Sequence, residues 1–527
     1  MKLPSRKVLA AALGLALAVS GPAAASAAAD IGWTQSGKLY EVRTWAGQAE
    51  PGAKDGKPAE ASLFYPYSIA QLPDGKLLVA DRGNHLIRTL TRDQLATYSG
   101  LSIGGDESGL PLGAYHDDKA PQAAFDSPKG VAVDRQSNAF VADSGNHAIR
   151  KVAQDGTVTT LAGNGLLGSD DGQGAKATFN APSDVAVDDR GNVYVADTLN
   201  HLIRKVAPDG TVTTLNAAST RVVQVVPGAV ESAGDFADGP IASAKFNEPS
   251  GLALDPKGNL YVSDRGNQNI RYIDFAAGTV TTVAGGTPTY AAGSSLYAAG
   301  DYADGLAADA RFHAPEGLAV APDGTLVIAD GLNHAVRLLK DGKVTTLAGE
   351  GGEYGAADGV LTAAMFNHPT DVAVLSDGRL AIADENGQKV RILAKYSGSN
   401  TVTKDGKVKT LLNGVLLKTE SPALLEQGAV LLPLRSVGQA LGYEVSFDSR
   451  AKTAKLAKGG VVYGIAGGQK KVVKQMNGAS SELVLNGAPV VRNGSLYVPV
   501  RFFAAEANLD IQWDGAVGTV VIRTPTF

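Results

Sequence analysis

The sequence predicts a mainly β protein in which a closed ring of six small sheets precedes a small α+β domain. Three observations predict this fold: a unit of four short strands occurs six times, a single strand stands ahead of the first unit, and a segment near the end of the chain is duplicated. With 63 glycines and 6% aromatic residues among 527, the composition also favours several β-rich domains.

The repeated unit is clearest in PSDVAVDDRGNVYVADTLNHLIRKVAPDGTVTTL, residues 182–215. Its runs DVAVD, NVYVAD, LIRKV and TVTTL are separated by turn sequences such as DRGN and PDGT, so we expect four antiparallel strands. Related units begin near Pro66, Pro128, Pro249, Pro315 and Pro369. Such recurrence is typical of blades arranged around an axis.

Two charged residues mark every unit: an Asp ends the second strand and an Arg follows seven residues later. The pairs are Asp81 and Arg88, Asp143 and Arg150, Asp197 and Arg204, Asp264 and Arg271, Asp330 and Arg337, and Asp384 and Arg391. Because they recur in every unit, we interpret both as structural, with the Asp forming a turn and the Arg pairing across blades.

The loop ahead of each unit has a pattern of its own. An aromatic residue precedes the Pro by two or three positions, at Phe64, Phe125, Phe179, Phe246, Phe312 and Phe366. Five loops also carry an Asp-Gly pair, at Asp55, Asp171, Asp238, Asp304 and Asp358. A calcium site would need more oxygen ligands than one Asp, so we interpret these pairs as turns.

The last unit, residues 369–394, lacks a fourth strand, and a matching strand stands near the N-terminus. EVRTW, followed by Ala46 and Gly47, has the pattern of TVTTLAG (157–163) and is followed by the same kind of loop. An open ring would expose two strand edges, so we predict that this strand closes a six-bladed β-propeller. KVKTLLN, residues 407–413, is the alternative closing strand.

The turns ADRGNHLIRTL, ADSGNHAIRKV, ADTLNHLIRKV and ADGLNHAVRLL resemble the Asn-His-Leu (NHL) repeat, while SDRGNQNIRYI and ADENGQKVRIL depart from it at the His. The resemblance covers residues 39–397 and implies a propeller scaffold. It implies no particular reaction, because this family includes binding domains as well as a few lyases and hydrolases.

Residues 407–527 are predicted to form a second domain behind a linker at 398–406. GAVLLPLRSVGQALGYEVSFDSRAKTAKL (428–456) aligns without gaps on GSLYVPVRFFAAEANLDIQWDGAVGTVVI (494–522), which predicts a duplicated strand, helix and two strands, with Pro433 and Pro499 at the first helical positions. The segment resembles the copper amine oxidase N-terminal-like (stalk) domain. Because residues 404–527 contain no His or Cys, we expect a spacer or docking module without copper.

Residues 1–29 are typical of a secretory signal peptide, with a basic start, an apolar run at 8–19 and a small-residue end. A membrane anchor is the alternative, but the run is shorter than the roughly 20 residues that a span needs. Removal of Lys2, Arg6 and Lys7 would shift the net charge from −5 to −8, which argues against nucleic-acid binding. We expect a secreted, extracellular protein without a transmembrane segment, associated with the cell wall.

Departures from the repeat indicate the candidate site. Length varies only in the loops that precede each Pro, which marks one face of the ring as the binding face. At its centre we expect Asp184, Glu316 and Asp371 as ligand-binding residues, with His313 and His368 nearby. These groups would suit one divalent cation, zinc or calcium, but we prefer a solvated acidic rim with two loop histidines and no cofactor.

These observations predict a secreted, non-enzymatic binding or adhesion protein of the bacterial cell envelope. The propeller would present a recognition face to a protein or cell-wall carbohydrate ligand, and the second domain would act as spacer or docking module. We expect a monomer. The alternative is a metal-dependent lyase or hydrolase with its site at the centre of the same face.

Overall fold

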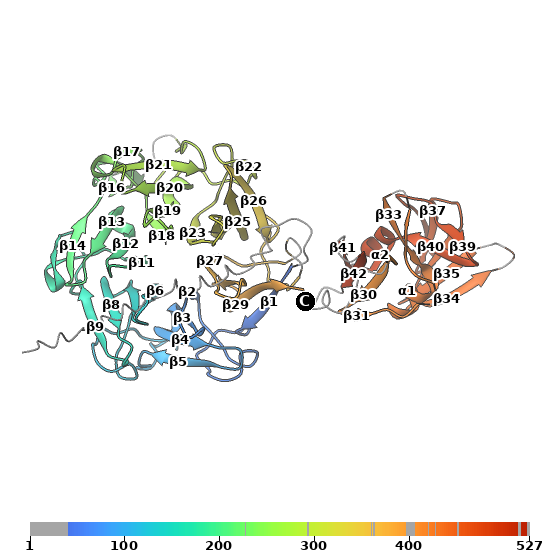
Figure 1. Cartoon of the computed structure of the whole chain (residues 1–527), viewed down its shortest axis with the longest axis horizontal. Coiled ribbons are helices and arrows are strands. Elements are labelled where there is room, and N and C mark those ends of the chain that lie inside the picture. The colour runs from blue at the N-terminus through green and yellow to red at the C-terminus, as the bar shows by residue number, and fades with distance from the viewer. Residues whose placement is uncertain are drawn as a thin grey trace, which may run out of the picture.

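The computed structural model describes residues 40–226, 228–291, 295–359, 361, 364–396, 406–419, 421–426, 428–448, 450, 453–507, 509–514 and 518–523. The predicted signal peptide and most of the predicted linker lie outside these residues. Six antiparallel sheets form a ring, and a second domain lies beside the sixth sheet (Figure 1). Within the described residues, no helix has the length and apolar character needed to cross a membrane.

Each blade contains the four strands that the repeat predicts, with the first strand innermost. Blade one has β2 (Pro66–Gln71), β3 (Leu77–Asp81), β4 (Leu86–Leu90) and β5 (Leu95–Ser99). Blade two has β6 (Pro128–Val133), β7 (Ala139–Asp143), β8 (Ala148–Val152) and β9 (Val158–Ala162). Blade three has β11 (Asp184–Val187), β12 (Val193–Asp197), β13 (Leu202–Val206) and β14 (Thr211–Thr214).

The second half of the ring continues the pattern. Blade four has β18 (Pro249–Leu254), β19 (Leu260–Asp264), β20 (Asn269–Asp274) and β21 (Thr279–Ala284). Blade five has β23 (Pro315–Val320), β24 (Leu326–Asp330), β25 (Ala335–Lys340) and β26 (Lys343–Ala348). Blade six has β27 (Pro369–Val374), β28 (Leu380–Asp384), β29 (Lys389–Lys395) and the N-terminal β1 (Tyr40–Ala46).

The N-terminal strand closes the ring, as predicted. β1 pairs antiparallel with β29, from Tyr40 opposite Lys395 to Ala46 opposite Val390. Val42 is completely buried in the apolar cluster between blades five and six. The alternative strand is wrong, because residues 409–412 form β30 (Lys409–Leu412) and pair with β42 (Thr519–Arg523) in the second domain.

The loops between blades also cover the outer strand edges. β10 (Gly172–Gln173), β17 (Gly239–Pro240) and β22 (Gly305–Leu306) add a short fifth strand outside β14, β21 and β26. A hairpin of β15 (Val222–Val226) and β16 (Ala229–Ser232) occupies the loop before blade four. Covered edges are unavailable for pairing with another chain.

The second domain confirms the internal duplication. Its first copy is β33 (Ala429–Pro433), α1 (Leu434–Ala440), β34 (Glu444–Asp448) and β35 (Thr453–Lys458), and its second is β40 (Ser495–Pro499), α2 (Val500–Ala507), β41 (Asp510–Asp514) and β42. Pro433 and Pro499 are the last residues of the preceding strands, so each helix begins one residue later than predicted. Both helices contribute to one core that includes Leu434, Val437 and Phe503.

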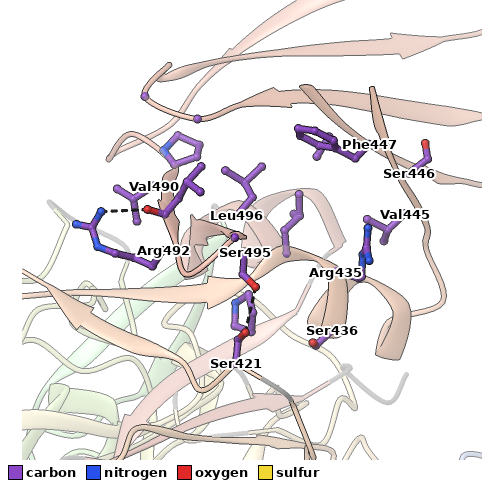
Figure 2. Close-up of a pocket in the computed structure, with 18 residues that line it drawn as sticks. Ser421, Arg435, Ser436, Val445, Ser446, Phe447, Val490, Arg492, Ser495 and Leu496 are labelled. Atoms are coloured by element: carbon purple, nitrogen blue, oxygen red, sulfur yellow. Dashed lines mark hydrogen bonds between the residues drawn. The ribbon is translucent and has the colours of Figure 1, made fainter. Parts of the chain in front are cut away.

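Short strands complete this domain: β31 (Val415–Leu416), β32 (Leu424–Glu426), β36 (Val461–Ala466), β37 (Lys471–Met476), β38 (Ala479–Val484) and β39 (Val490–Arg492). A cavity of about 700 Å³ opens between α1, β34 and the turn joining β39 to β40 (Figure 2). Phe447 and Val491 line it, and both side chains are more than half exposed.

The two domains meet at the closing strand. Arg523 Nη1 of β42 lies 2.8 Å from Glu41 Oε2 of β1, and both side chains are only 11% exposed. Tyr396, which directly follows β29, packs against Leu411 and Val521 of the second domain. The second domain therefore contacts the strand that closes the propeller.

Candidate functional site

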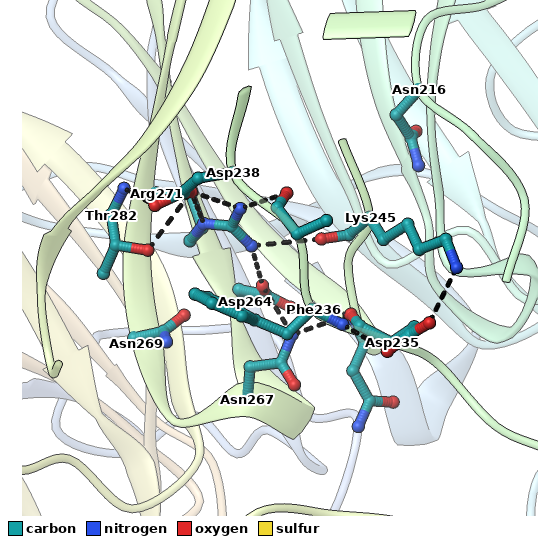
Figure 3. Close-up of polar contacts among 12 residues, drawn as sticks. Asn216, Asp235, Phe236, Asp238, Lys245, Asp264, Asn267, Asn269, Arg271 and Thr282 are labelled. Atoms are coloured by element: carbon teal, nitrogen blue, oxygen red, sulfur yellow. Dashed lines mark hydrogen bonds and ion pairs between the residues drawn. The ribbon is translucent and has the colours of Figure 1, made fainter. Parts of the chain in front are cut away.

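The repeated Asp and Arg side chains form a structural network inside each blade. In blade four, Arg271 Nη1 lies 2.6 Å from Asp264 Oδ2 and Nη2 lies 2.5 Å from Asp238 Oδ1, while Thr282 donates its backbone N–H to Asp238 (Figure 3). The same Arg–Asp contacts occur in all six blades, and all six Arg side chains are fully buried. These contacts support the predicted structural role, but pairing across blades is wrong: each Arg binds its own blade and the loop leading into it.

This network corrects two further details of the repeat. Blade two has no Asp-Gly pair, but Asp117 takes the place of its Asp and contacts Arg150 and Thr160. In blade one the buried position is held by Leu63, whereas Phe64 is only partly buried and stacks on Tyr65. The closing strand obeys the pattern too, since Thr44 Oγ1 donates to Asp358 Oδ1 at 3.0 Å.

The His of the repeat links neighbouring blades. Its side chain follows the turn after the second strand, and its Nδ1 accepts a backbone N–H from the next blade: His201, for example, accepts from Glu248 at 3.0 Å. Where the His is absent, Gln268 and Gln388 accept the equivalent N–H through Oε1, from Ala314 and Tyr65. The two departures from the repeat therefore keep the same contact, and Gln388 completes it between blades six and one.

The loops between blades and the turns after the second strands lie on one face of the ring, because the four strands of each blade run antiparallel. We call it the loop face. The innermost strands of neighbouring blades contact one another around the axis, so two sets of residues meet near its centre. One set follows the Pro of each unit and the other follows its Asp: Tyr67, Lys129, Ser183, Ser250, Glu316 and Thr370; Arg82, Ser144, Thr198, Arg265, Gly331 and Glu385.

Local geometry explains why the residue after the Pro can change without damage to the sheet. In blades one, four and six it is the unpaired residue of a β-bulge, as between Pro66 and Ser68. A small hydroxyl side chain at this position donates to a backbone carbonyl of the next blade, as Ser250 does to Pro315 at 3.0 Å. Tyr67, Lys129 and Glu316 replace that link with larger groups.

Four of these residues form an ion-paired chain together with His368. Glu316 Oε1 lies 3.3 Å from Arg265 Nε and 3.3 Å from His368 Nε2. His368 Nδ1 lies 2.7 Å from Glu385 Oε2, and Glu385 Oε1 lies 2.8 Å from Arg82 Nη2. The carboxylates are deeply buried, with side chains 4% exposed for Glu316 and 6% for Glu385.

The charges in this chain hold one another in place. Burial lowers the pKa of His368, but the carboxylates of Glu316 and Glu385 outweigh burial and raise it to about 10. Burial raises the pKa of Glu316, but His368 and Arg265 outweigh it and lower the pKa to about 2. At neutral pH His368 is therefore an imidazolium between two carboxylates, and it is not a free base.

Lys129 completes the group. Its Nζ lies 5.3 Å from the ring centre of Tyr67, a cation–π contact. Burial and the nearby Arg82 lower the pKa of Lys129. Among the described residues no carboxylate lies within ion-pair distance of this amine. We define the charged cluster as Tyr67, Arg82, Lys129, Arg265, Glu316, His368 and Glu385.

Several buried polar atoms of the charged cluster have no hydrogen-bond partner among the described residues. They are Arg82 Nε, Arg265 Nε, Glu316 Oε2, His368 Nε2 and Glu385 Oε1. Three of these atoms lie at ion-pair distance from an oppositely charged partner: Arg265 Nε, His368 Nε2 and Glu385 Oε1. Buried polar atoms in native proteins are normally satisfied, so we take the charged cluster as the candidate site on the loop face.

Of the residues expected at this site, Glu316 and His368 come together, while Asp184 and Asp371 lie in the inner strands. Asp184 Oδ2 accepts the N–H of Leu252 at 2.8 Å and Asp371 Oδ2 accepts that of Ile69 at 2.8 Å, which links blades three to four and six to one. Burial raises the pKa of Asp371 to about 7, and burial together with the charge of Asp371 raises that of Asp184.

His313 is not equivalent to His368. It occupies the position of Phe64, two residues before the Pro, and its backbone N–H donates to Asp330. Burial and the nearby Arg265 lower its pKa. Among the described residues no three His, Cys, Asp or Glu side chains are arranged to bind a metal ion. The predicted role of these histidines as metal ligands remains a prediction.

Most residues of the charged cluster were not predicted from the sequence: Tyr67, Arg82, Lys129, Arg265 and Glu385. A signal was present, because each of these residues directly follows the repeated Pro or Asp and differs from blade to blade. The predicted binding face itself has support in exposed apolar side chains on the loops between blades. They include Leu101, Ile103, Leu110 and Leu112 before blade two, Leu166 and Leu167 before blade three, and Tyr354 before blade six.

Family models match both parts of the chain. The NHL repeat matches residues 179–206, 246–271 and 366–393, and the copper amine oxidase N-terminal domain matches residues 411–522. These matches confirm both resemblances found in the sequence.

Curated relatives share the propeller part. The protein SUPPRESSOR OF QUENCHING 1, chloroplastic, of Arabidopsis thaliana is 30% identical over 370 residues, which cover 66% of this chain and 32% of that protein. Human NHL repeat-containing protein 2 is 29% identical over 360 residues, covering 64% of this chain and 48% of that protein. The chain thus spans a third to a half of the length of these relatives. An auxiliary nutrient binding protein from Bacteroides thetaiotaomicron is 16% identical, with a TM-score of 0.49 and coverage of 68% and 76% of the two chains.

Proposed function

Because the chain combines an NHL-repeat propeller with a copper amine oxidase N-terminal domain, we propose that it is a non-enzymatic binding protein that recognises its ligand through the loop face. One observation carries the proposal: the residues that break the six-fold repeat meet at the centre of that face, and they leave buried polar atoms without partners. Exposed apolar side chains surround this centre on the inter-blade loops. A polar centre within an apolar rim suits recognition of a ligand larger than the centre itself.

The opposite face differs in the character of its turns. Its turns are short and polar, as in Pro73–Lys76 and Pro208–Thr211, where an Asp side chain accepts N–H groups of its own turn. Such turns stabilise hairpins and offer little apolar area to a partner. The contrast between the faces supports recognition on the loop face.

We further propose that the protein is exported and associated with the bacterial cell wall as a monomer. The predicted signal peptide and the absence of Cys from the sequence support export without dependence on disulfides. The second domain would then serve as spacer or docking module, and its cavity (Figure 2) offers a surface for docking.

The alternative, a metal-dependent lyase or hydrolase, has less support. Both ring nitrogens of His368 face carboxylates, with Nδ1 2.7 Å from Glu385 Oε2 and Nε2 3.3 Å from Glu316 Oε1, so this histidine is engaged in ion pairs. Metal analysis of the purified protein tests this alternative directly. One equivalent of zinc that is lost in His368→Ala would favour the enzyme over the binding protein.

Co-sedimentation with purified cell-wall sacculi tests the proposed function. The protein should sediment with sacculi, and a variant with Leu110, Leu112, Leu166 and Leu167 all replaced by Ser should lose about tenfold or more of its affinity. Leu306→Ser is the matched control, since Leu306 is 59% exposed but belongs to the outer strand β22. Equal sedimentation of the loop variant and the control would refute recognition through the loop face.

A further inference from the structure

We infer that the charged cluster is the receptor for a carboxylated sugar, an inference that deepens the proposed function and rests on it. The cluster lies at the centre of the loop face, where any ligand bound by the apolar loops would present one of its groups. Its chemistry restricts what that group can be.

The balance of charges calls for an anion. Arg82, Arg265 and His368 each have a carboxylate partner, supplied by Glu385, Glu316 and Glu248. Lys129 is the remaining cation, and no described carboxylate lies within ion-pair distance of it. Burial and the nearby Arg82 lower the pKa of Lys129, and the attraction of Glu316 and Glu385 offsets them only in part. A negative group of the ligand beside Lys129 would complete the balance.

The unpartnered atoms call for hydroxyl groups as well. Among the described residues, Arg82 Nε can only donate and Glu316 Oε2 can only accept, and neither has a hydrogen-bond or ion-pair partner. A phosphate or a peptide C-terminal carboxylate offers acceptors alone and would leave Glu316 Oε2 unsatisfied. Neighbouring hydroxyls of a sugar donate and accept together, so a sugar with one carboxylate satisfies both kinds of atom.

Burial makes the arrangement selective. The side chains of Glu316 and Glu385 are at least nine-tenths buried, and their positions are held by the ion pairs described above. A ligand therefore meets donors and acceptors that are already oriented, in surroundings where charge contacts are stronger than in water. A sugar without the carboxylate would leave Lys129 uncompensated.

Glucuronate and glucose form a matched pair of probes, because they differ only in the carboxylate that replaces the terminal CH₂OH. Titration of the full mature chain at low salt, followed by ligand-observed NMR, should give about tenfold tighter binding of glucuronate than of glucose, the size of effect expected for one partly buried charge contact. Lys129→Gln should remove this preference, and Lys129→Arg should retain it. Glu316→Gln should weaken both sugars, and inorganic phosphate should not compete at the concentration of sugar used.

Equal binding of the two sugars, no binding of either, or a preference that survives Lys129→Gln would overturn the inference. Melting temperatures of the variants identify a misfolded protein, and Lys129→Arg keeps the test decisive if Lys129→Gln does not fold. The proposed function is tested separately by the sacculi. If loop-dependent sedimentation persists without sugar binding, the carboxylated sugar is wrong but the loop face stands.

Discussion

The stabilising contact that His201 makes between blades three and four should be lost at acidic pH, and substitution of His201 should remove this pH dependence of stability. His201 is 8% exposed, and its Nδ1 accepts the N–H of Glu248, which requires the neutral ring. Burial and the nearby Arg221 lower its pKa from 6.5 to about 4. The folded state therefore favours neutral His201, and its stabilising contribution is present above pH 6.5 and is lost as the pH falls toward 4.

The size of the effect follows from these two pKa values. For a group that titrates at 6.5 when unfolded and at about 4 when folded, linkage gives a loss of about 2 kcal/mol between pH 7 and pH 5. The repeat itself supplies the variant that isolates this loss. Gln268 and Gln388 accept the equivalent N–H in left-handed turns like that of His201, and Gln does not titrate.

His201→Gln should therefore be nearly as stable as the native protein at pH 7 and about 2 kcal/mol more stable than it at pH 5. Urea unfolding followed by circular dichroism at both pH values measures the difference, and all other titrating groups are common to the two proteins. Gln388→His is the reverse variant and should add pH dependence. If the native protein and His201→Gln lose the same stability between pH 7 and pH 5, the neutral-acceptor argument is wrong.

Three further predictions concern the scaffold. Val42→Ala in the closing strand should lower the free energy of unfolding by about 2–3 kcal/mol, because it removes two carbon atoms from a fully buried site. Val230 is 67% exposed, so Val230→Ala should leave stability unchanged in the same urea titration. Equal effects of the two variants would mean that β1 is not packed as described. Gly317→Ala would place a Cβ 2.2 Å from Asp371 Oδ1, so the melting temperature of this variant should fall by an amount equivalent to about 1–3 kcal/mol. Gly464→Ala is the control and should melt at the native temperature, because the nearest atom to its Cβ would be 3.7 Å away. A native melting temperature for Gly317→Ala would contradict the tight contact between blades five and six. Arg523→Met should break the ion pair with Glu41 and increase the rate of tryptic cleavage between the domains several-fold. Arg501→Met is the control, because Arg501 is exposed. An unchanged cleavage rate in Arg523→Met would show that this contact does not hold the domains together.

Much of the fold was predictable because it depends on patterns of residues that are close together in the sequence. The Asp and Arg of each unit recur at a constant spacing, and an unpaired edge in blade six requires a closing strand, so EVRTW could be placed from the sequence. The exceptions had local causes as well. In blade one Leu63 takes the buried position of the aromatic residue, and in blade two Asp117 takes the position of the Asp of the Asp-Gly pair. Neither replacement matches the sequence pattern of the repeat.

Residue order along the chain thus determined the six blades, the strand that closes them, the duplicated second domain and the face that carries variable loops. Only the tertiary structure decided which charged residues share a site. Tyr67, Lys129, Glu316 and Glu385 belong to four different blades, and they approach one another because the innermost strands converge on the axis. The tertiary structure also decided that Asp184 and Asp371 accept backbone N–H groups of the neighbouring blade instead of joining the ion-paired chain. The spacing of residues in the sequence gives their positions within a blade. The ion pairs of the charged cluster depend instead on the distances between blades, and those distances are set by closure of the ring.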